Sequence, residues 1–211
     1  MEKTKLKIEE EASQVFSECF EKTCAEYLIP IGIAREIKAA WKMKYVPAHT
    51  LLFERGQYFT EIWFVAYGAI RSSRIVDDKE WIYSLSVQKQ YIGDYKSYLT
   101  GKPSILSFET MADSVIYVIE KNDLEKIYDQ YPEANEFGRF LAEYATSFIN
   151  QRILGMQTMS LKERYKRLLE TFPEVAQKMH QQDIAAYLGA KPQSLSRMKS
   201  QLLKGDSPDL Q

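Results

Sequence analysis

The sequence predicts an α+β protein, built from a small all-β unit, a long helix that follows it and a pair of short helices near the C-terminus. Between Pro47 and Asn122, short runs of β-branched and aromatic residues alternate with turn residues. After Pro132 no further proline occurs until beyond Met156, and apolar residues recur there at helical spacing. Residues 181–199 then indicate two short helices that meet at a glycine.

The N-terminal part, residues 6–40, is predicted to be helical, with an interruption at residues 29–32. In its second half, apolar side chains recur at three- and four-residue steps, so Ala34, Ile37 and Trp41 share one face. At least two helices therefore precede the all-β unit.

The all-β unit is predicted from its strands and from the turns between them. The strand-like runs are Leu51–Phe53, Ile62–Arg71, Trp81–Leu85 and Val115–Ile119. The turn residues that punctuate them at short, similar intervals are Gly56, Gly68, Asp77–Lys79, Gly93–Asp94 and Gly101–Pro103. Such punctuation is typical of a double-sheet roll. Asn122 offers a capping residue for a helix that carries Leu124 and Ile127.

An aromatic-rich stripe marks the long helix. Its members step by four, three and four residues and therefore lie on one face: Phe137, Leu141, Tyr144 and Phe148. A helix with such a stripe requires a packing partner. Two interpretations are open: the stripe packs against the β-unit of its own chain, or it forms the seam of a two-fold homodimer.

The C-terminal pair of helices has the pattern of a helix-turn-helix. Ile184, Ala185 and Leu188 fall on one face, Gly189 supplies the positive φ that ends a helix, and Pro192 suits a first helical turn. The second helix has an apolar face, Leu195, Met198 and Leu202, and a polar face, Gln193, Ser196, Arg197 and Ser200. Amides, hydroxyls and a guanidinium can read the edges of DNA bases. The alternative is a helical hairpin whose polar face is only solvated.

Charge is distributed unevenly along the 211 residues. The formal net charge is −1, but from Met159 onward nine Lys and Arg stand against six Asp and Glu, which leaves +3 there and −4 in the preceding part. A basic C-terminal part behind an acidic front suits a module that faces phosphates. No run of about 18 apolar residues occurs, and the first twenty positions lack the apolar core of a secretory signal. We therefore expect a cytoplasmic location and no membrane partner.

Residues that could hold a metal or a cluster are few. Cys19 and Cys24 are too few for an iron–sulfur cluster. Neither His49 nor His180 has a second histidine nearby, so we expect no metal site and no cofactor. The enzyme alternative, a metal-dependent double-sheet roll of the cupin kind, requires two or three clustered histidines, and the roll contains only His49. We expect no catalytic residues.

The order of these pieces resembles the bacterial transcription regulators of the cyclic-AMP receptor protein and fumarate-nitrate regulator (CRP/FNR) family. The likeness covers about residues 40–203. The motifs that carry it are Gly68–Arg71, Glu163–Tyr165, Leu168–Leu169, Phe172–Glu174, Asp183–Gly189 and Ser194–Arg197. The resemblance implies a cyclic-nucleotide-binding-like β-roll with N-terminal helices over residues 1–131, a dimerisation helix over 132–157, and a winged-helix-like helix-turn-helix domain over 158–211. Because Gly205–Pro208 indicates a frayed tail, we expect a terminal wing to be absent or minimal.

The resemblance also implies a homodimer on a two-fold site in double-stranded DNA. Gln193 and Arg197 would face base edges, with Ser200 on the same polar face, and the residues that would face phosphates are Gln181, Gln182, Lys191 and Ser194. Arg197 is the strongest candidate, because a guanidinium can make paired hydrogen bonds to guanine. Lys191 replaces a commoner capping Ser or Thr, either because a DNA phosphate neutralises it or because the surface tolerates it. RNA polymerase is a further candidate partner, and a protein-interaction module that no longer touches DNA is the alternative function.

The effector pocket that the resemblance implies lies near Gly93, Asp94, Ser104 and Ile105. Relatives that bind cyclic nucleotide hold its phosphate with a Gly-Glu pair and with an Arg followed by Ser or Thr. In this chain the pair is Gly93–Asp94, and Ser104 and Ile105 stand where the Arg and its hydroxyl neighbour would be. We therefore do not expect cyclic AMP to be the effector. The roll either binds an unidentified small molecule or serves as a structural scaffold.

Overall fold

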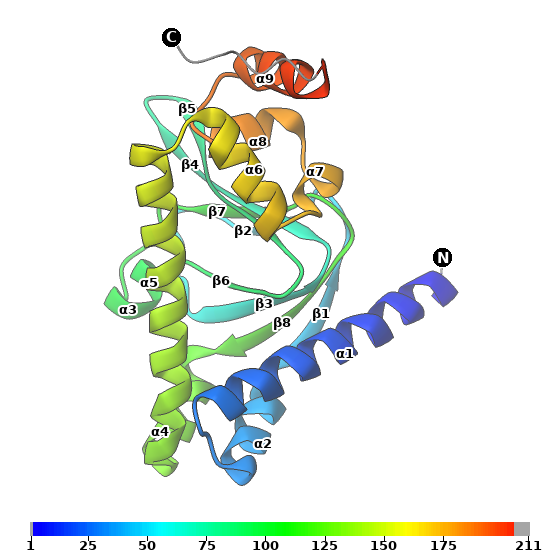
Figure 1. Ribbon diagram of the computed structural model, residues 1–211. Helices are drawn as coiled ribbons and strands as arrows, with labels where there is room; N and C mark the ends of the chain where they lie inside the picture. The colour runs from blue at the N-terminus through cyan, green and yellow to red at the C-terminus, as the bar shows by residue number, and fades with distance from the viewer. Residues whose placement is uncertain (1, 205–211) are drawn as a thin grey trace.

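The computed structural model describes residues 2–204 and consists of a β-roll surrounded by helices (Figure 1). The strands are β1 (Lys42–Val46), β2 (Leu51–Phe53), β3 (Glu61–Tyr67), β4 (Ala69–Val76), β5 (Lys79–Val87), β6 (Gln90–Ile92), β7 (Ser107–Thr110) and β8 (Ser114–Glu120). The helices are α1 (Glu2–Glu26), α2 (Ile31–Ala40), α3 (Tyr95–Thr100), α4 (Lys121–Gln130), the 3₁₀ turn η1 (Pro132–Ala134), α5 (Asn135–Thr158), α6 (Leu161–Thr171), α7 (Val175–Lys178), α8 (Gln181–Tyr187) and α9 (Pro192–Lys204). The predicted α+β class is confirmed. Within residues 2–204 no strand follows β8, and the predicted frayed tail at Gly205–Pro208 lies outside that range.

Two four-stranded antiparallel sheets form the roll. One has the order β1-β8-β3-β6 and the other the order β2-β7-β4-β5. The ladder between β4 and β5 extends from the pair Ala69 and Val87 to the pair Val76 and Lys79. At its tip Asp77 and Asp78 have φ values of 49° and 59°, the geometry of a type I′ turn, whose twist matches that of the two strands. The sequence prediction of a double-sheet roll is therefore confirmed.

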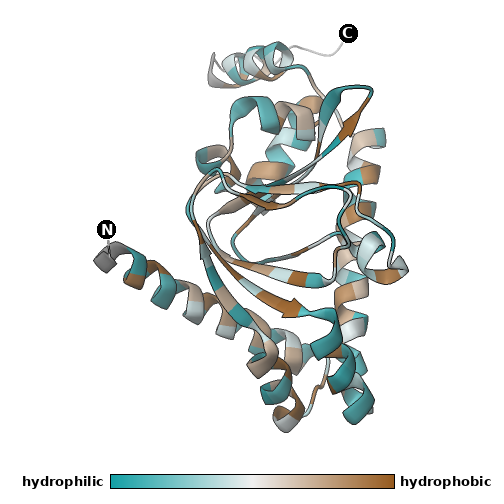
Figure 2. Cartoon of the chain, turned by 180° about the vertical axis from the view of Figure 1, so that it is seen from behind, coloured by the Kyte–Doolittle hydropathy of each residue, from teal (hydrophilic) through white to brown (hydrophobic). Residues whose placement is uncertain are grey.

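Helices α1 and α5 bury their apolar faces on the first sheet. The ring of Phe16 in α1 stacks on that of Tyr117 in β8 at a centroid distance of 3.9 Å. Phe137 of α5 is fully buried, 5.6 Å from the ring of Phe20 in α1. Brown and teal bands alternate along both helices in Figure 2, as expected when one face of a helix is buried and the other is solvated.

The aromatic stripe of α5 therefore packs against its own chain over its first half. Phe137 is 0% exposed and Leu141 5% exposed, so neither side chain can contact a second subunit, and the dimer-seam interpretation is wrong for these two residues. Tyr144 and Phe148 are half-buried. The spacing identified the buried face of the helix correctly, but a spacing pattern does not say whether the partner belongs to the same chain.

A second hydrophobic core joins the C-terminal helices to the second sheet. The roll contributes Ala69, Ile82, Leu85, Val87 and Met111, and the helices contribute Tyr165, Leu168, Val175, Met179, Ile184, Ala185, Leu188 and Leu195. Helix α8 lies directly on β5. The predicted boundaries at residues 131 and 157 fall next to the ends of α4 and α5, but residues 158–204 share their core with the roll.

Gly68 permits the tight connection between β3 and β4. Its φ is +94°, and a Cβ at this position would lie 2.6 Å from the backbone oxygen of Asp113. We expect Gly68→Ala to destabilise the fold by about 1–3 kcal/mol through backbone strain, with a further loss from the overlap with Asp113. Urea unfolding measures the loss. Gly32→Ala is the matched control, because a Cβ there meets nothing within 4 Å, and an equal loss of stability in both variants would contradict the prediction.

Candidate nucleic-acid interface and effector cavity

Helices α8 and α9 form the predicted helix-turn-helix. The amide of Ala190 donates to the carbonyl of Ala185 (2.9 Å) and that of Gly189 to Ala186 (3.0 Å), the hydrogen-bond pair of a Schellman motif. Gly189 has a φ of +68°, which a glycine adopts without strain. Leu195 is 1% exposed and anchors α9 against the rest of the domain. The turn therefore fixes which face of α9 points outward.

The outward face of α9 carries the residues that the sequence predicted for base contacts. Gln193, Arg197 and Ser200 are exposed, as are the four predicted phosphate-facing residues, Gln181, Gln182, Lys191 and Ser194. Among the described residues, Arg197 takes part in no ion pair or side-chain hydrogen bond, so its guanidinium is free to bind an external acceptor. The hydroxyl of Ser200 instead donates to the carbonyl of Ser196 within the helix (3.0 Å).

Lys199 is a residue of this surface that the sequence prediction missed. Its Nζ donates to Oε1 of Gln181 at 2.7 Å and lies 5.8 Å from the ring centre of Tyr165 in α6. The contact ties the start of α8 to α9. A lysine near the end of a helix is compatible with many roles, so the sequence did not indicate that Lys199 contacts Gln181.

A cavity of about 400 Å³ lies between the roll and α5. Of the four predicted effector residues, Gly93 and Asp94 line it, whereas Ser104 lies behind Asp94 and Ile105 is 47% exposed and faces away. Assigning Ile105 to the pocket was therefore wrong: counting along the chain cannot locate a side chain in a loop, and Ile105 lies just before β7. The ring-bearing residues of the wall are Tyr83, Tyr91, Tyr95, Phe108, Tyr144 and Phe148.

Asp94 lies at the N-terminus of α3. Its side chain accepts a hydrogen bond from the amide of Ser97 (3.1 Å) and so caps α3, and it accepts a second from the hydroxyl of Ser104 (2.6 Å). Asp94 is 7% exposed. The start of α3, where a phosphate could otherwise bind, is therefore already occupied by a carboxylate of the protein. Lys96 is the one cation in the cavity wall, and its side chain is exposed.

The phenols of the cavity wall stay neutral at neutral pH. Burial raises the pKa of Tyr144 to about 12. Burial, followed by the negative charge of Asp94, also raises the pKa of Tyr83. The wall thus offers aromatic rings and neutral hydroxyls beside one buried carboxylate, which favours an uncharged ligand over an anionic one.

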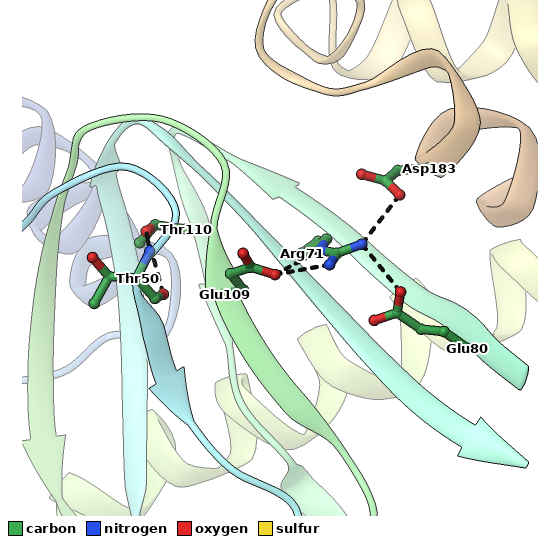
Figure 3. A network of polar contacts seen from close by, with 6 residues as sticks. All are labelled: Thr50, Arg71, Glu80, Glu109, Thr110 and Asp183. Carbon is green, nitrogen blue, oxygen red and sulfur yellow. Dashed lines mark hydrogen bonds and ion pairs between the residues drawn. The ribbon is translucent and has the colours of Figure 1, made fainter. Parts of the chain in front are cut away.

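Arg71 links the roll to the helix-turn-helix through an ion cluster in which only Asp183 is buried (Figure 3). Its guanidinium contacts Glu109 at 2.8 Å, Asp183 of α8 at 3.2 Å and Glu80 at 3.4 Å. Burial raises the pKa of Asp183, although the positive charge of Arg71 acts in the opposite direction. Oδ2 of Asp183 is buried without a hydrogen-bond partner. Arg71 and Asp183 belong to separate motifs of the predicted resemblance, and nothing in the sequence indicated that they meet.

The two histidines also meet at this junction. The rings of His49 and His180 lie parallel, with centroids 6.1 Å apart. The expectation that neither has a second histidine nearby was therefore wrong, because it considered neighbours in the sequence only. Within residues 2–204, no group of three or more His, Cys, Asp or Glu residues is arranged to hold a metal ion.

Comparison with known proteins supports the same fold. Residues 43–131 match the cyclic nucleotide-binding domain family. FixK2 from Bradyrhizobium japonicum is similar at a TM-score of 0.63 and 18% identity, covering 81% of this chain and 89% of that one. A putative transcriptional regulator of the CRP/FNR family from Eubacterium rectale is similar at 0.62 and 15%, covering 84% and 85%. The c-di-GMP-responsive regulator CLP from Xanthomonas campestris is similar at 0.59 and 14%, covering 83% and 93%.

These likenesses define the fold of the protein. At identities below 20% they concern the fold, and a search of the curated proteins found no match. The predicted resemblance is nevertheless confirmed: residues 43–131 match the cyclic nucleotide-binding domain model, and the chain has the fold of CRP/FNR transcription regulators. Every helix within residues 2–204 is too short or too polar to cross a bilayer.

Proposed function

We propose that the chain is a transcription regulator that binds DNA as a homodimer through α9. The observation that carries the proposal is the exposed polar face of α9, held outward by the buried Leu195. Arg197 and Gln193 on this face suit base edges, and Lys191 and Gln182 at its border suit phosphates. The regulator folds of similar proteins support the same role.

Selection from a pool of random oligonucleotides tests this proposal. We expect enrichment of a two-fold sequence, with an affinity that falls steeply as salt is added, because phosphate contacts release counterions. No enrichment and no salt dependence would contradict the proposal. Binding of a protein partner in place of DNA would support the alternative of an interaction module.

The C-terminal half of α5 is the dimer surface that we propose in place of Phe137 and Leu141. Ile149, Ile153 and Met156 are spaced by four and three residues, and they are 40%, 49% and 41% exposed. An apolar stripe of this kind on a long helix suits a second copy of the same helix across a two-fold axis.

We expect Ile153→Glu to convert the dimer to a monomer, because two carboxylates would face each other across the two-fold axis and could not be buried. Size-exclusion chromatography with light scattering measures the change in mass. Ser147→Glu is the control, since Ser147 is exposed on the opposite face of α5. A dimer that withstands Ile153→Glu would contradict this choice of surface.

We propose further that the cavity beside α5 takes an uncharged, largely apolar effector and does not bind cyclic AMP. Asp94 opposes a phosphate at the start of α3, and no arginine lines the wall. The aromatic rings of the wall suit a ligand with its own ring system.

Thermal unfolding tests the choice of ligand class. Cyclic AMP at about 1 mM is expected to leave the unfolding temperature unchanged. If cyclic AMP bound the folded protein with a dissociation constant of about 10 μM, this concentration would raise the free energy of unfolding by about 2.7 kcal/mol. The uncharged fluorophore N-phenyl-1-naphthylamine is expected to bind with enhanced emission, and Ala145→Trp, which fills the cavity, to abolish that signal. Saturable stabilisation by cyclic AMP would contradict the proposal.

A further inference from the structure

A second, smaller cavity lies where the long helix meets the C-terminal helices. Its volume is about 90 Å³, and its wall is formed by the last turns of α5, by α6 and by the end of α8. Helices α5 and α6 are joined there by two residues only, Met159 and Ser160. A capping box between Ser160 and Glu163 fixes the start of α6. Any group bound in this cavity would touch both sides of the junction.

Three arginines line this cavity, and no carboxylate does. They are Arg152 of α5 and Arg164 and Arg167 of α6. Within residues 2–204, none of the three forms an ion pair with an acidic residue, although most other buried or half-buried cations of the chain do. Arg71, for comparison, has three carboxylate partners. The cavity therefore concentrates positive charge that the protein itself does not neutralise.

Arg152 is half-buried and is held by backbone carbonyls. Its Nη1 donates to the carbonyl of Tyr83 at 2.6 Å, and its Nη2 donates to those of Ile82 (3.3 Å) and Tyr187 (3.2 Å). Its Nε is buried and has no hydrogen-bond partner. Burial lowers the pKa of this guanidinium, which is the sign of a cation that lacks a counter-charge.

The other two arginines leave donors unused as well. Arg164 donates through Nε to the carbonyl of Leu188 (3.1 Å) and through Nη1 to that of Met159. Arg167 donates through Nη2 to the amide oxygen of Gln151 (3.2 Å) and through Nη1 to the sulfur of Met159 (3.9 Å). Carbonyl and amide acceptors satisfy single hydrogen bonds, but they bring no net charge. A guanidinium presents five N–H donors in a planar fork, the geometry that oxyanions accept in pairs.

We propose that this cavity, the α5–α6 junction site, binds a phosphate group. Its size admits a few water molecules or one tetrahedral oxyanion, and excludes a nucleotide. The ligand is therefore free inorganic phosphate or the phosphate end of a small metabolite whose remainder extends outside. Either would supply the negative charge that the three arginines lack, and it would join α5 to α6.

The proposal stands apart from DNA binding, because the site lies at the inner side of α6 and does not include α9. Isothermal titration calorimetry on the full chain, in chloride buffer of constant ionic strength, measures the interaction directly. We expect saturable binding of inorganic phosphate with one site per chain. A parallel titration with glycerol 3-phosphate distinguishes the two sources, since tighter binding of the ester indicates a metabolite.

Arg167→Gln is the decisive variant. Arg167 is half-buried and donates to Gln151 and to the sulfur of Met159, so its loss leaves no buried acid unpaired. We expect phosphate affinity to fall about ten-fold or more, because a charge-assisted pair is lost. Lys162→Gln is the matched control: it removes one positive charge from the same helix at an exposed position outside the cavity, and we expect unchanged affinity.

Three outcomes would overturn the proposal. One is a phosphate effect that does not saturate, or that chloride reproduces. Another is an equal loss of affinity in Arg167→Gln and Lys162→Gln, which would indicate general charge attraction. The third is a loss of unfolding temperature in Arg167→Gln that is the same with and without phosphate, which would show that the arginines act only as structural ties between helices.

Discussion

Replacing Arg197 with alanine is expected to abolish the preference of the protein for its operator while leaving the fold intact. Arg197 is exposed, and its guanidinium has no partner among the described residues, so its removal costs no internal contact. A bidentate arginine–guanine pair contributes about 1–3 kcal/mol of discrimination. Discrimination against the wrong base therefore falls by about 5- to 150-fold per half-site, and a two-fold operator, which has two half-sites, loses this factor twice.

Affinity for the selected operator and for a scrambled duplex, measured by fluorescence anisotropy, checks this expectation. Arg197→Ala should weaken the operator and barely change the scrambled duplex, because non-specific binding depends on phosphates. Lys191→Gln should instead weaken both duplexes alike and reduce the salt slope by about one per subunit. If Arg197→Ala still preferred the operator over the scrambled duplex to the same extent, Arg197 would not be a residue that recognises the bases.

Replacing Arg71 with methionine is expected to destabilise the chain by about 3–5 kcal/mol. Asp183, Glu109 and Glu80 would lose their shared cation, and Asp183 would remain as a buried carboxylate without a partner. Urea unfolding measures the loss. Lys79→Met, at the exposed end of β5, is the control and should change stability by less than about 0.5 kcal/mol.

The pH dependence of this deficit follows from Asp183. Burial raises the folded-state pKa of Asp183 above its unfolded value of about 3.9, so its contribution to stability is fully present below that value and is lost as pH rises through the folded pKa. Loss of the Arg71 charge raises the folded pKa further. The deficit of Arg71→Met should therefore be smallest in acid and grow as pH rises.

A double-mutant cycle with Asp183→Asn separates this pair from its surroundings. Glu80 and His180 also act on Asp183, and both remain in every variant of the cycle. We expect Arg71→Met to cost less in the Asp183→Asn background, since one buried charge has been removed. Additive effects of the two substitutions would show that the pair is not coupled.

Local patterns in the sequence predicted the elements and their faces well. The Gly189 turn, the burial of Leu195 and the exposure of Arg197 all follow from helical spacing and from the conformational freedom of glycine, which are properties of neighbouring residues. The double-sheet roll likewise follows from short strands and regular turns. Each of these features depends on fewer than about twenty consecutive residues.

Contacts between distant segments could not be predicted in this way. Arg71 and Asp183 are 112 positions apart, and their meeting depends on α8 lying on β5. The same packing brings His49 and His180 together. The spacing of Phe137 and Leu141 defined a face that had to be covered, but not which chain covers it. Asp94 is a departure from the pattern that the resemblance implies, and its hydrogen bond with Ser104 is visible only in the structure.

The shared second core has a consequence for how such proteins can be recombined. Ile82 and Leu85 of the roll are covered by Ile184 and Leu188 of the C-terminal helices. A chimera that joins a foreign C-terminal domain to this roll would leave these apolar side chains poorly packed unless both surfaces were redesigned together. The roll and the C-terminal helices therefore depend on each other for their packing, and neither can be replaced alone.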